Sequence, residues 1–198
     1  MAEAHETLEH TEHAEHASHG GNKGIALLIS VLALFLALSE TLGKSAQTAA
    51  ISFNVQASDD WAFYQAKTIR MGQLQTAADT MALTSQGTTD AALKEAQAKQ
   101  IEVWRKEAAR NDDEPGRNGR KQLTEKARFS EEQRETAMAR YHNYEFASAA
   151  FQIGIVLASA MIITGIAALA WLAGALGVVG IAFMAVGLFA PHLIHALG

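Results

Sequence analysis

The chain has 198 residues, no cysteine and a formal net charge of −5, with 49% hydrophobic and 19% charged residues. The absence of cysteine excludes disulfides, thiolate nucleophiles, iron–sulfur clusters and Cys-ligated zinc within this sequence. Charges nearly balance in the middle of the chain, so the sequence has no basic face for nucleic acid and no polybasic patch for lipid headgroups.

Residues 1–24 form a polar tail rich in histidine and glutamate. Imidazole and carboxylate groups together suit zinc, copper or nickel, so the tail is a candidate metal-binding segment. The same repeat is typical of a solvated, compositionally biased tail, or of a segment that titrates near neutral pH. We expect no cofactor, unless zinc or another divalent transition metal binds the histidines that recur every third residue: His10, His13, His16 and His19.

Residues 25–42 form an apolar run that is long enough for a first transmembrane span. The triplet Ala37-Leu38-Ser39 resembles a signal-peptidase site, which leaves cleavage as an alternative. A signal peptide needs a basic start, however, and the segment before this run is acidic. An uncleaved span is therefore the favoured interpretation.

Residues 43–145 are polar and rich in helix-forming residues, with apolar residues recurring at intervals of three and four. This spacing predicts amphipathic helices that pack on one another. Loops are expected at residues 86–89 and 111–119, where glycine, proline and aspartate gather. Nothing but Gly43 interrupts the pattern after the first span, and nothing interrupts it before the second, so we expect helices that continue into the spans.

No Asp, Glu, Lys or Arg follows Glu145. A helical pass takes about 20 apolar residues, so the remaining stretch is long enough for two passes. We place these spans at residues 146–172 and 175–197, with a glycine-permitted turn near residues 172–177. The sequence as a whole predicts an all-α fold, with three transmembrane helices and a helical, coiled-coil-like stalk between spans one and two.

The segment from Ala57 to Lys67, which reads Ala-Ser-Asp-Asp-Trp-Ala-Phe-Tyr-Gln-Ala-Lys, resembles a bacterial inner-membrane family known as domain of unknown function 4337. The His/Glu-rich start, the early span and the paired C-terminal spans resemble that family too. The resemblance implies a bacterial inner membrane as the location. It implies no activity and no catalytic residue.

Lys and Arg residues near the ends of spans indicate which side of a membrane a segment occupies. Lys44, Arg134 and Arg140 lie near the span ends on the stalk side, whereas the tail side has only Lys23. This imbalance favours a cytoplasmic stalk.

By the parity of three crossings, four ionisable residues meet at the membrane face on the stalk side: Glu40, His142, His192 and His195. Such groups are able to form a proton-handling, metal or quinone-headgroup site. The alternative is an ordinary interfacial set, because polar residues gather wherever spans leave lipid. No ionisable group lies in the middle of a span, which argues against an ion pump or transporter.

Ala150, Gly154 and Ala158 form a small-residue ridge, which lets helices approach closely in lipid. The ridge serves either packing within the chain or association with another membrane protein. No catalytic motif is present, so we expect no enzyme. The expected function is an integral membrane scaffold or accessory subunit, in a homo-oligomer or a larger membrane complex. The alternative is a metal-binding or sensing protein acting through the His-rich tail.

Overall fold

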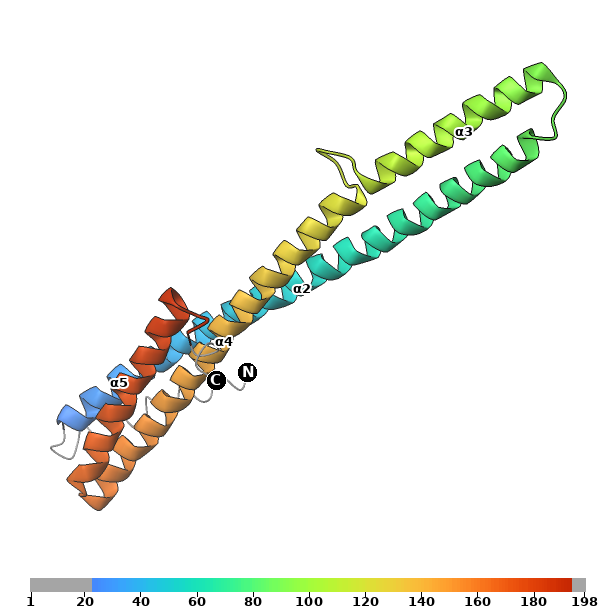
Figure 1. Cartoon of the computed structure of the whole chain (residues 1–198). Helices are drawn as coiled ribbons and strands as arrows, with labels where there is room; N and C mark the ends of the chain where they lie inside the picture. The colour runs from blue at the N-terminus through green and yellow to red at the C-terminus, as the bar shows by residue number, and fades with distance from the viewer. Residues whose placement is uncertain (1–22, 194–198) are drawn as a thin grey trace. The chain divides into compact units, whose positions relative to one another are not determined.

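The computed structural model describes residues 23–193, and this part of the chain consists of α-helices without any strand. Helix α2 spans Lys23–Ser85, α3 spans Ala91–Asp112, α4 spans Arg120–Thr164 and α5 spans Ala167–Phe189 (Figure 1). The predicted all-α fold is confirmed. Helices α2, α4 and α5 are each long and apolar enough to cross a membrane, which agrees with the three predicted spans.

The chain divides into two compact units. Unit 1 comprises residues 1–51 and 135–198, of which the structure describes 23–51 and 135–193. Unit 2 comprises residues 52–134. Helices α2 and α4 contribute to both units, so the predicted continuation of spans one and two into polar helices is confirmed.

The hydrophobic core of unit 1 lies among α2, α4 and α5. Ile29, Leu32 and Leu36 recur at intervals of three and four on α2, and their side chains are buried. They pack with a matching row on α4, and the rings of Phe35 and Phe151 stack with their centroids 5.8 Å apart. The remaining members of this core are Ala46 of α2 and seven residues of α4 and α5: Tyr144, Ala147, Phe151, Ile155, Ala158, Ala173 and Met184.

Small residues bring these three helices close together. A Cβ atom on Gly154 of α4 would lie 3.2 Å from Leu32 Cδ1 and 3.3 Å from the carbonyl oxygen of Ala173. A Cβ atom on Gly177 of α5 would lie 2.8 Å from Leu32 Cδ2. The predicted ridge that contains Gly154 is therefore buried by packing within the chain, the first of its two alternatives.

The turn between the last two apolar helices does not lie at the predicted residues 172–177. Helix α5 runs without interruption through residues 172–177, and the chain reverses instead at Gly165 and Ile166. Gly165 has φ +71°, a left-handed conformation that favours glycine. The glycines at 174 and 177 are helical, and Gly177 gives room to Leu32. The predicted boundaries 146–172 and 175–197 do not coincide with the helices, because α4 ends at Thr164 and α5 covers Ala167–Phe189.

Unit 2 is a helical hairpin in which α2 lies beside α3 and the first part of α4 (Figure 1). Both predicted loops are present, at residues 86–90 and 113–119. The Asp90 side chain starts α3 by accepting hydrogen bonds from the backbone N–H groups of Ala92 and Leu93. Helices α2 and α3 therefore reverse through a short capped turn.

Few apolar side chains of unit 2 are fully buried. Among residues 52–134, the buried hydrophobic residues are Ala57, Ala78, Ala108, Leu123 and Ala127. Four of these five are alanines, which let two helices approach closely but remove little apolar surface from water. Unit 2 therefore has a thin core.

Candidate functional site

Buried polar side chains link the three helices of unit 1 at one end. Ser39 on α2 is fully buried, and its hydroxyl donates to the backbone carbonyl of Tyr144 on α4 at 2.8 Å. Asn143, which is 2% exposed, donates from Nδ2 to the carbonyl oxygens of Ala139 and Pro191, at 2.8 and 3.1 Å. The second bond holds the segment after α5 against α4.

Each described ionisable residue that was predicted to share a site contacts a different residue. Glu40 Oε1 accepts a hydrogen bond of 3.4 Å from Gln152 Nε2. His142 Nδ1 lies 3.6 Å from Glu145 Oε2, one turn along the same helix. His192 Nε2 lies 3.1 Å from the hydroxyl oxygen of Thr136.

These contacts lie at different levels of α4, because the partners of Glu40 and His192, Gln152 and Thr136, are 16 residues apart on that helix. Within residues 23–193, no group of three His, Asp or Glu side chains is arranged to hold a metal ion. His195 lies outside the described residues, as do the tail histidines His10, His13, His16 and His19. Metal binding by the tail therefore stays a prediction.

Three residues that make the polar contacts between helices here were not among the site residues predicted from the sequence: Ser39, Asn143 and Gln152. A signal for them was present, because each is a polar residue within or beside an apolar run. In lipid a polar side chain needs a hydrogen-bond partner on its own helix or a neighbouring one. Ser39 and Gln152 lie within the predicted spans 25–42 and 146–172, and Asn143 lies three residues before the second of these.

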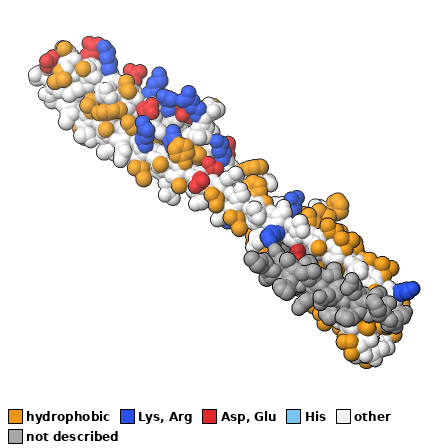
Figure 2. All heavy atoms as spheres, turned by 180° about the vertical axis from the view of Figure 1, so that it is seen from behind, with side chains coloured by type: hydrophobic (Ala, Val, Ile, Leu, Met, Phe, Trp, Pro, Cys, Tyr) orange, Lys and Arg blue, Asp and Glu red, His pale blue; other side chains and the backbone are white. Residues whose placement is uncertain are grey.

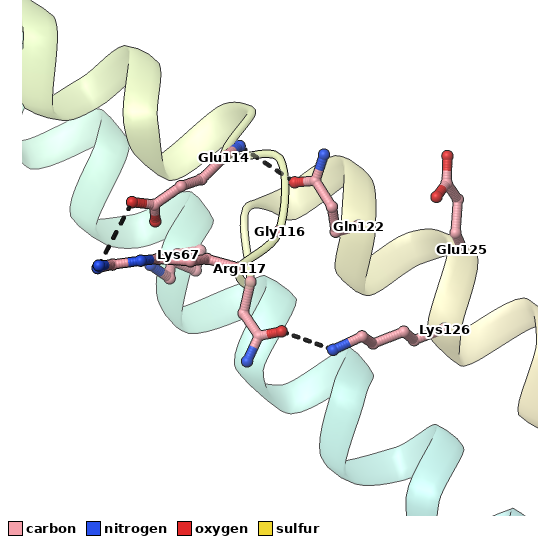
Figure 3. A pocket seen from close by; sticks show the side chains of 8 residues that line it. Lys67, Glu114, Gly116, Arg117, Gln122, Glu125 and Lys126 are labelled. Carbon is pink, nitrogen blue, oxygen red and sulfur yellow. Dashed lines mark hydrogen bonds and ion pairs between the residues drawn. The ribbon is translucent and has the colours of Figure 1, made fainter.

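A surface hollow in unit 2 lies at the loop between α3 and α4 (Figure 3). Its polar groups largely bind one another. The backbone N–H of Glu114 donates to Gln122 Oε1 at 3.1 Å, and Lys126 Nζ donates to Asn118 Oδ1 at 2.7 Å. The hollow is lined by Lys67, Glu114, Gly116, Arg117, Asn118, Gln122, Glu125 and Lys126.

Hydrogen bonds to the charged forms of two carboxylates stabilise this loop. The pKa of Asp113 lies below its ordinary value, because Gln122 and Lys121 donate hydrogen bonds to the carboxylate. The pKa of Glu114 is likewise lowered, chiefly by the hydrogen bond from Arg110 at 2.8 Å. Because each acceptor is already paired within the loop, we interpret the hollow as part of a well-ordered connection.

The most unusual surface of unit 2 is apolar. Large hydrophobic side chains are exposed to solvent there, and Figure 2 shows hydrophobic side chains, in orange, interspersed with charged ones. Single exposed apolar residues are ordinary on a soluble protein, but a thin core combined with many of them is not. The exposed set in unit 2 comprises Val55, Phe63, Ile69, Leu83, Leu93, Val103 and Phe129.

Comparison with known proteins gives one finding on this fold. Residues 21–190 match the family described as Domain of unknown function (DUF4337). The match covers α2, α3, α4 and α5, and so includes both units. No curated protein and no solved structure matches the chain.

Proposed function

Because the chain belongs to the family described as Domain of unknown function (DUF4337), which carries no assigned activity, we propose its function from its geometry. We propose an integral membrane scaffold or accessory subunit that associates with itself or with another membrane complex. Unit 1 is the membrane anchor in this proposal, and unit 2 is the part that binds a partner.

The observation that carries the proposal is the contrast in unit 2 between its alanine-rich core and its exposed apolar residues. Fully burying a Val, Leu, Ile or Phe side chain is worth about 1.5–3 kcal/mol. Ile69 and Leu83 are 63% and 69% exposed, so most of that stabilisation is absent from an isolated chain. A partner helix lying on these residues would supply it.

The outer surface of unit 1 supports the anchoring role. Large apolar side chains cover it, and Ile163, Trp171 and Phe189 are 87%, 82% and 86% exposed. In water this surface would drive aggregation, whereas in a bilayer it faces lipid chains. The lipid bilayer is therefore the first partner we propose.

We place the protein in a bacterial inner membrane with unit 2 on the cytoplasmic side. Lys44, Arg134 and Arg140 outnumber Lys23 near the span ends, and Lys and Arg favour the cytoplasmic face. The proposed role is structural and not catalytic. In its favour, the charged groups around the α3–α4 loop are paired with one another instead of converging on a reaction centre.

Metal binding or sensing through the tail is the alternative function. It rests on the three-residue histidine repeat from His10 to His19 and on the ligand chemistry of imidazole. Zinc titration of the full chain in detergent, compared with a chain lacking residues 1–21, tests this alternative. Saturable binding by the full chain alone supports it, and equal binding by both contradicts it.

Native mass spectrometry of the full chain, extracted from membranes with its lipids, tests the scaffold proposal. We expect a homo-oligomer or a stoichiometric complex with another membrane protein. The matched variant is Leu83→Gln, since Leu83 is exposed and its replacement leaves the core of unit 2 intact. A monomer without any co-purifying protein contradicts the proposal.

A further inference from the structure

We propose that the partner of unit 2 is a second copy of this chain, which pairs with the first along the outer face of α2 in parallel and in register. This inference rests on the proposed function and names its partner. It begins from five residues of α2 spaced by seven, all of which face solvent: Val55, Ala62, Ile69, Thr76 and Leu83. These five residues are called the outer stripe below.

The outer stripe repeats in phase with the inner face of α2. Ala57, Tyr64, Met71 and Ala78, which are buried or half-buried, also recur every seven residues. The first four stripe residues each lie two positions before one of these inner-face residues, and so about 160° around a helix that turns 100° per residue. On a straight α-helix, residues spaced by seven rotate slowly around the helix axis. On a helix in a left-handed supercoil, the same residues stay on one side. A left-handed supercoil that keeps the inner face on one side of α2 therefore also keeps the outer stripe on one side.

The outer stripe is uncharged, and this property fits a partner with the same surface. In a symmetric pair each residue lies against its own copy, so a charged residue would meet a like charge. None of the five stripe residues carries a charge. Within residues 52–85, the exposed charged residues of α2 are Asp59, Arg70 and Asp79. The shorter helix α3 exposes seven: Lys94, Glu95, Lys99, Glu102, Arg105, Lys106 and Arg110. Self-pairing through α2 is accordingly favoured over self-pairing through α3.

Membrane anchoring sets the direction and register of this pair. Helix α2 is continuous from Lys23 to Ser85, so the first span and the outer stripe lie on the same helix. Two copies inserted in one bilayer with the same topology present α2 in the same direction and from the same depth. Val55 then meets Val55 of the other copy, and Leu83 meets Leu83. Because anchoring fixes the orientation beforehand, association loses less rotational freedom than it would in solution.

Cysteine cross-linking tests this pairing, since the chain contains no cysteine of its own. Ile69→Cys, in full-length protein in vesicles of phosphatidylethanolamine and phosphatidylglycerol, should yield a covalent dimer on mild oxidation. The matched control is Lys99→Cys on α3, at a side chain that is 74% exposed. We expect dimer from Ile69→Cys and little from Lys99→Cys. Equal dimer from both overturns the inference.

Register is tested with two differently tagged chains, one carrying Val55→Cys and the other Leu83→Cys. Parallel pairing gives covalent dimers of each chain with itself and none between the two, whereas mixed dimers overturn the inference. Adding Ile69→Lys to the Val55→Cys chain should abolish its dimer, while circular dichroism shows unchanged helix content. If the stripe gives no dimer but native mass shows a complex, this inference fails and the scaffold function stands. A monomer in both experiments removes both.

Discussion

The hydroxyl of Ser39 donates a hydrogen bond to the backbone carbonyl of Tyr144 across 2.8 Å, joining α2 to α4 at a position where Ser39 is fully buried. This bond spans 105 residues of sequence. We predict that Ser39→Ala lowers the free energy of unfolding by about 0.5–1.5 kcal/mol, the usual worth of one internal hydrogen bond. The carbonyl of Tyr144 lies within α4 and keeps its place in the helix ladder, which limits the loss.

Denaturant titration of the detergent-solubilised chain, followed by circular dichroism, measures this effect. Ser30→Ala is the matched control, because Ser30 is exposed and bonds only to Ala26 of its own helix at 2.9 Å. We expect no change for the control. An equal loss of unfolding free energy in both variants would show that the hydrogen bond between Ser39 and Tyr144 is not the cause of the stabilisation.

The close approach of α5 to Phe151 predicts a steric effect. A Cβ atom at Gly180 would lie 2.6–2.9 Å from three atoms of the Phe151 ring, which is fully buried and stacks on Phe35. The ring has little room to move, so Gly180→Ala should destabilise unit 1 by about 1–3 kcal/mol. The loss should shrink when Phe151→Leu is added.

The control for that steric effect is Gly174→Ala, because a Cβ atom at Gly174 would meet nothing within 4 Å. Thermal unfolding in one detergent compares four chains: the unmodified chain, Gly180→Ala, Gly180→Ala with Phe151→Leu, and Gly174→Ala. Equal stability of the Gly180 and Gly174 variants would contradict the packing described here.

In unit 2, the indole Nε1–H of Trp61 donates to Glu131 Oε1 at 2.9 Å in a partly buried position. Glu131→Leu should cost about 1–2 kcal/mol, because it leaves that donor without a partner. Asp79→Ala should change stability by less than about 0.5 kcal/mol, since the exposed pair of Asp79 and Arg105 is screened by water. Hydrogen exchange of unit 2 amides in the full chain distinguishes the two. Equal exchange in both variants would argue against a structural role for the indole bond.

The loop between α3 and α4 should loosen in acid. Hydrogen bonds lower the pKa of Asp113 from 3.8 and that of Glu114 from 4.5. A carboxyl group with a lowered pKa in the folded state contributes stability above its unfolded pKa and loses that contribution as pH falls through the folded value. The loop should therefore stay ordered at pH 5 and lose protection only below about pH 4.

Carboxyl carbon shifts, measured by NMR on the full chain in detergent, follow the two titrations directly. Gln122→Ala removes the largest cause of the Asp113 shift and should raise the pKa of Asp113 toward 3.8. The pKa of Glu114 should move little, because its main donor is Arg110. A lowered pKa at Asp113 that survives this substitution contradicts the proposed cause.

The proposed cytoplasmic position of unit 2 predicts a labelling pattern in intact bacteria. Lys99→Cys places one thiol on the exposed face of α3 in a chain that otherwise has none. A membrane-impermeant maleimide should label it only after the inner membrane is opened. Labelling in cells whose outer membrane alone is permeabilised would reverse the orientation.

Much of the fold follows from periodicity. Intervals of three and four predicted continuous helices through Gly43 and Tyr144, and α2 and α4 have them. The last turn was misplaced because glycine serves two purposes, and sequence does not distinguish a reversal at Gly165 from close packing at Gly177.

The polar contacts of unit 1 were less accessible to sequence reasoning. Counting the crossings predicted that Glu40, His142, His192 and His195 meet at the membrane face on the stalk side. It did not reveal the partners of Glu40 and His192, because contacts such as Glu40–Gln152 join residues 112 positions apart. Such contacts depend on how far each side chain extends toward the neighbouring helix. The pattern of hydrophobic residues in the sequence carries no information on that distance.

Lipid around α2, α4 and α5 is the condition on which both proposals rest. Alkaline carbonate extraction of membranes containing the full chain tests this condition most directly. The exposed apolar surface of unit 1 predicts that the chain stays in the membrane pellet and leaves it only with detergent. Release by carbonate into a monodisperse, detergent-free solution would show that these helices are not membrane spans.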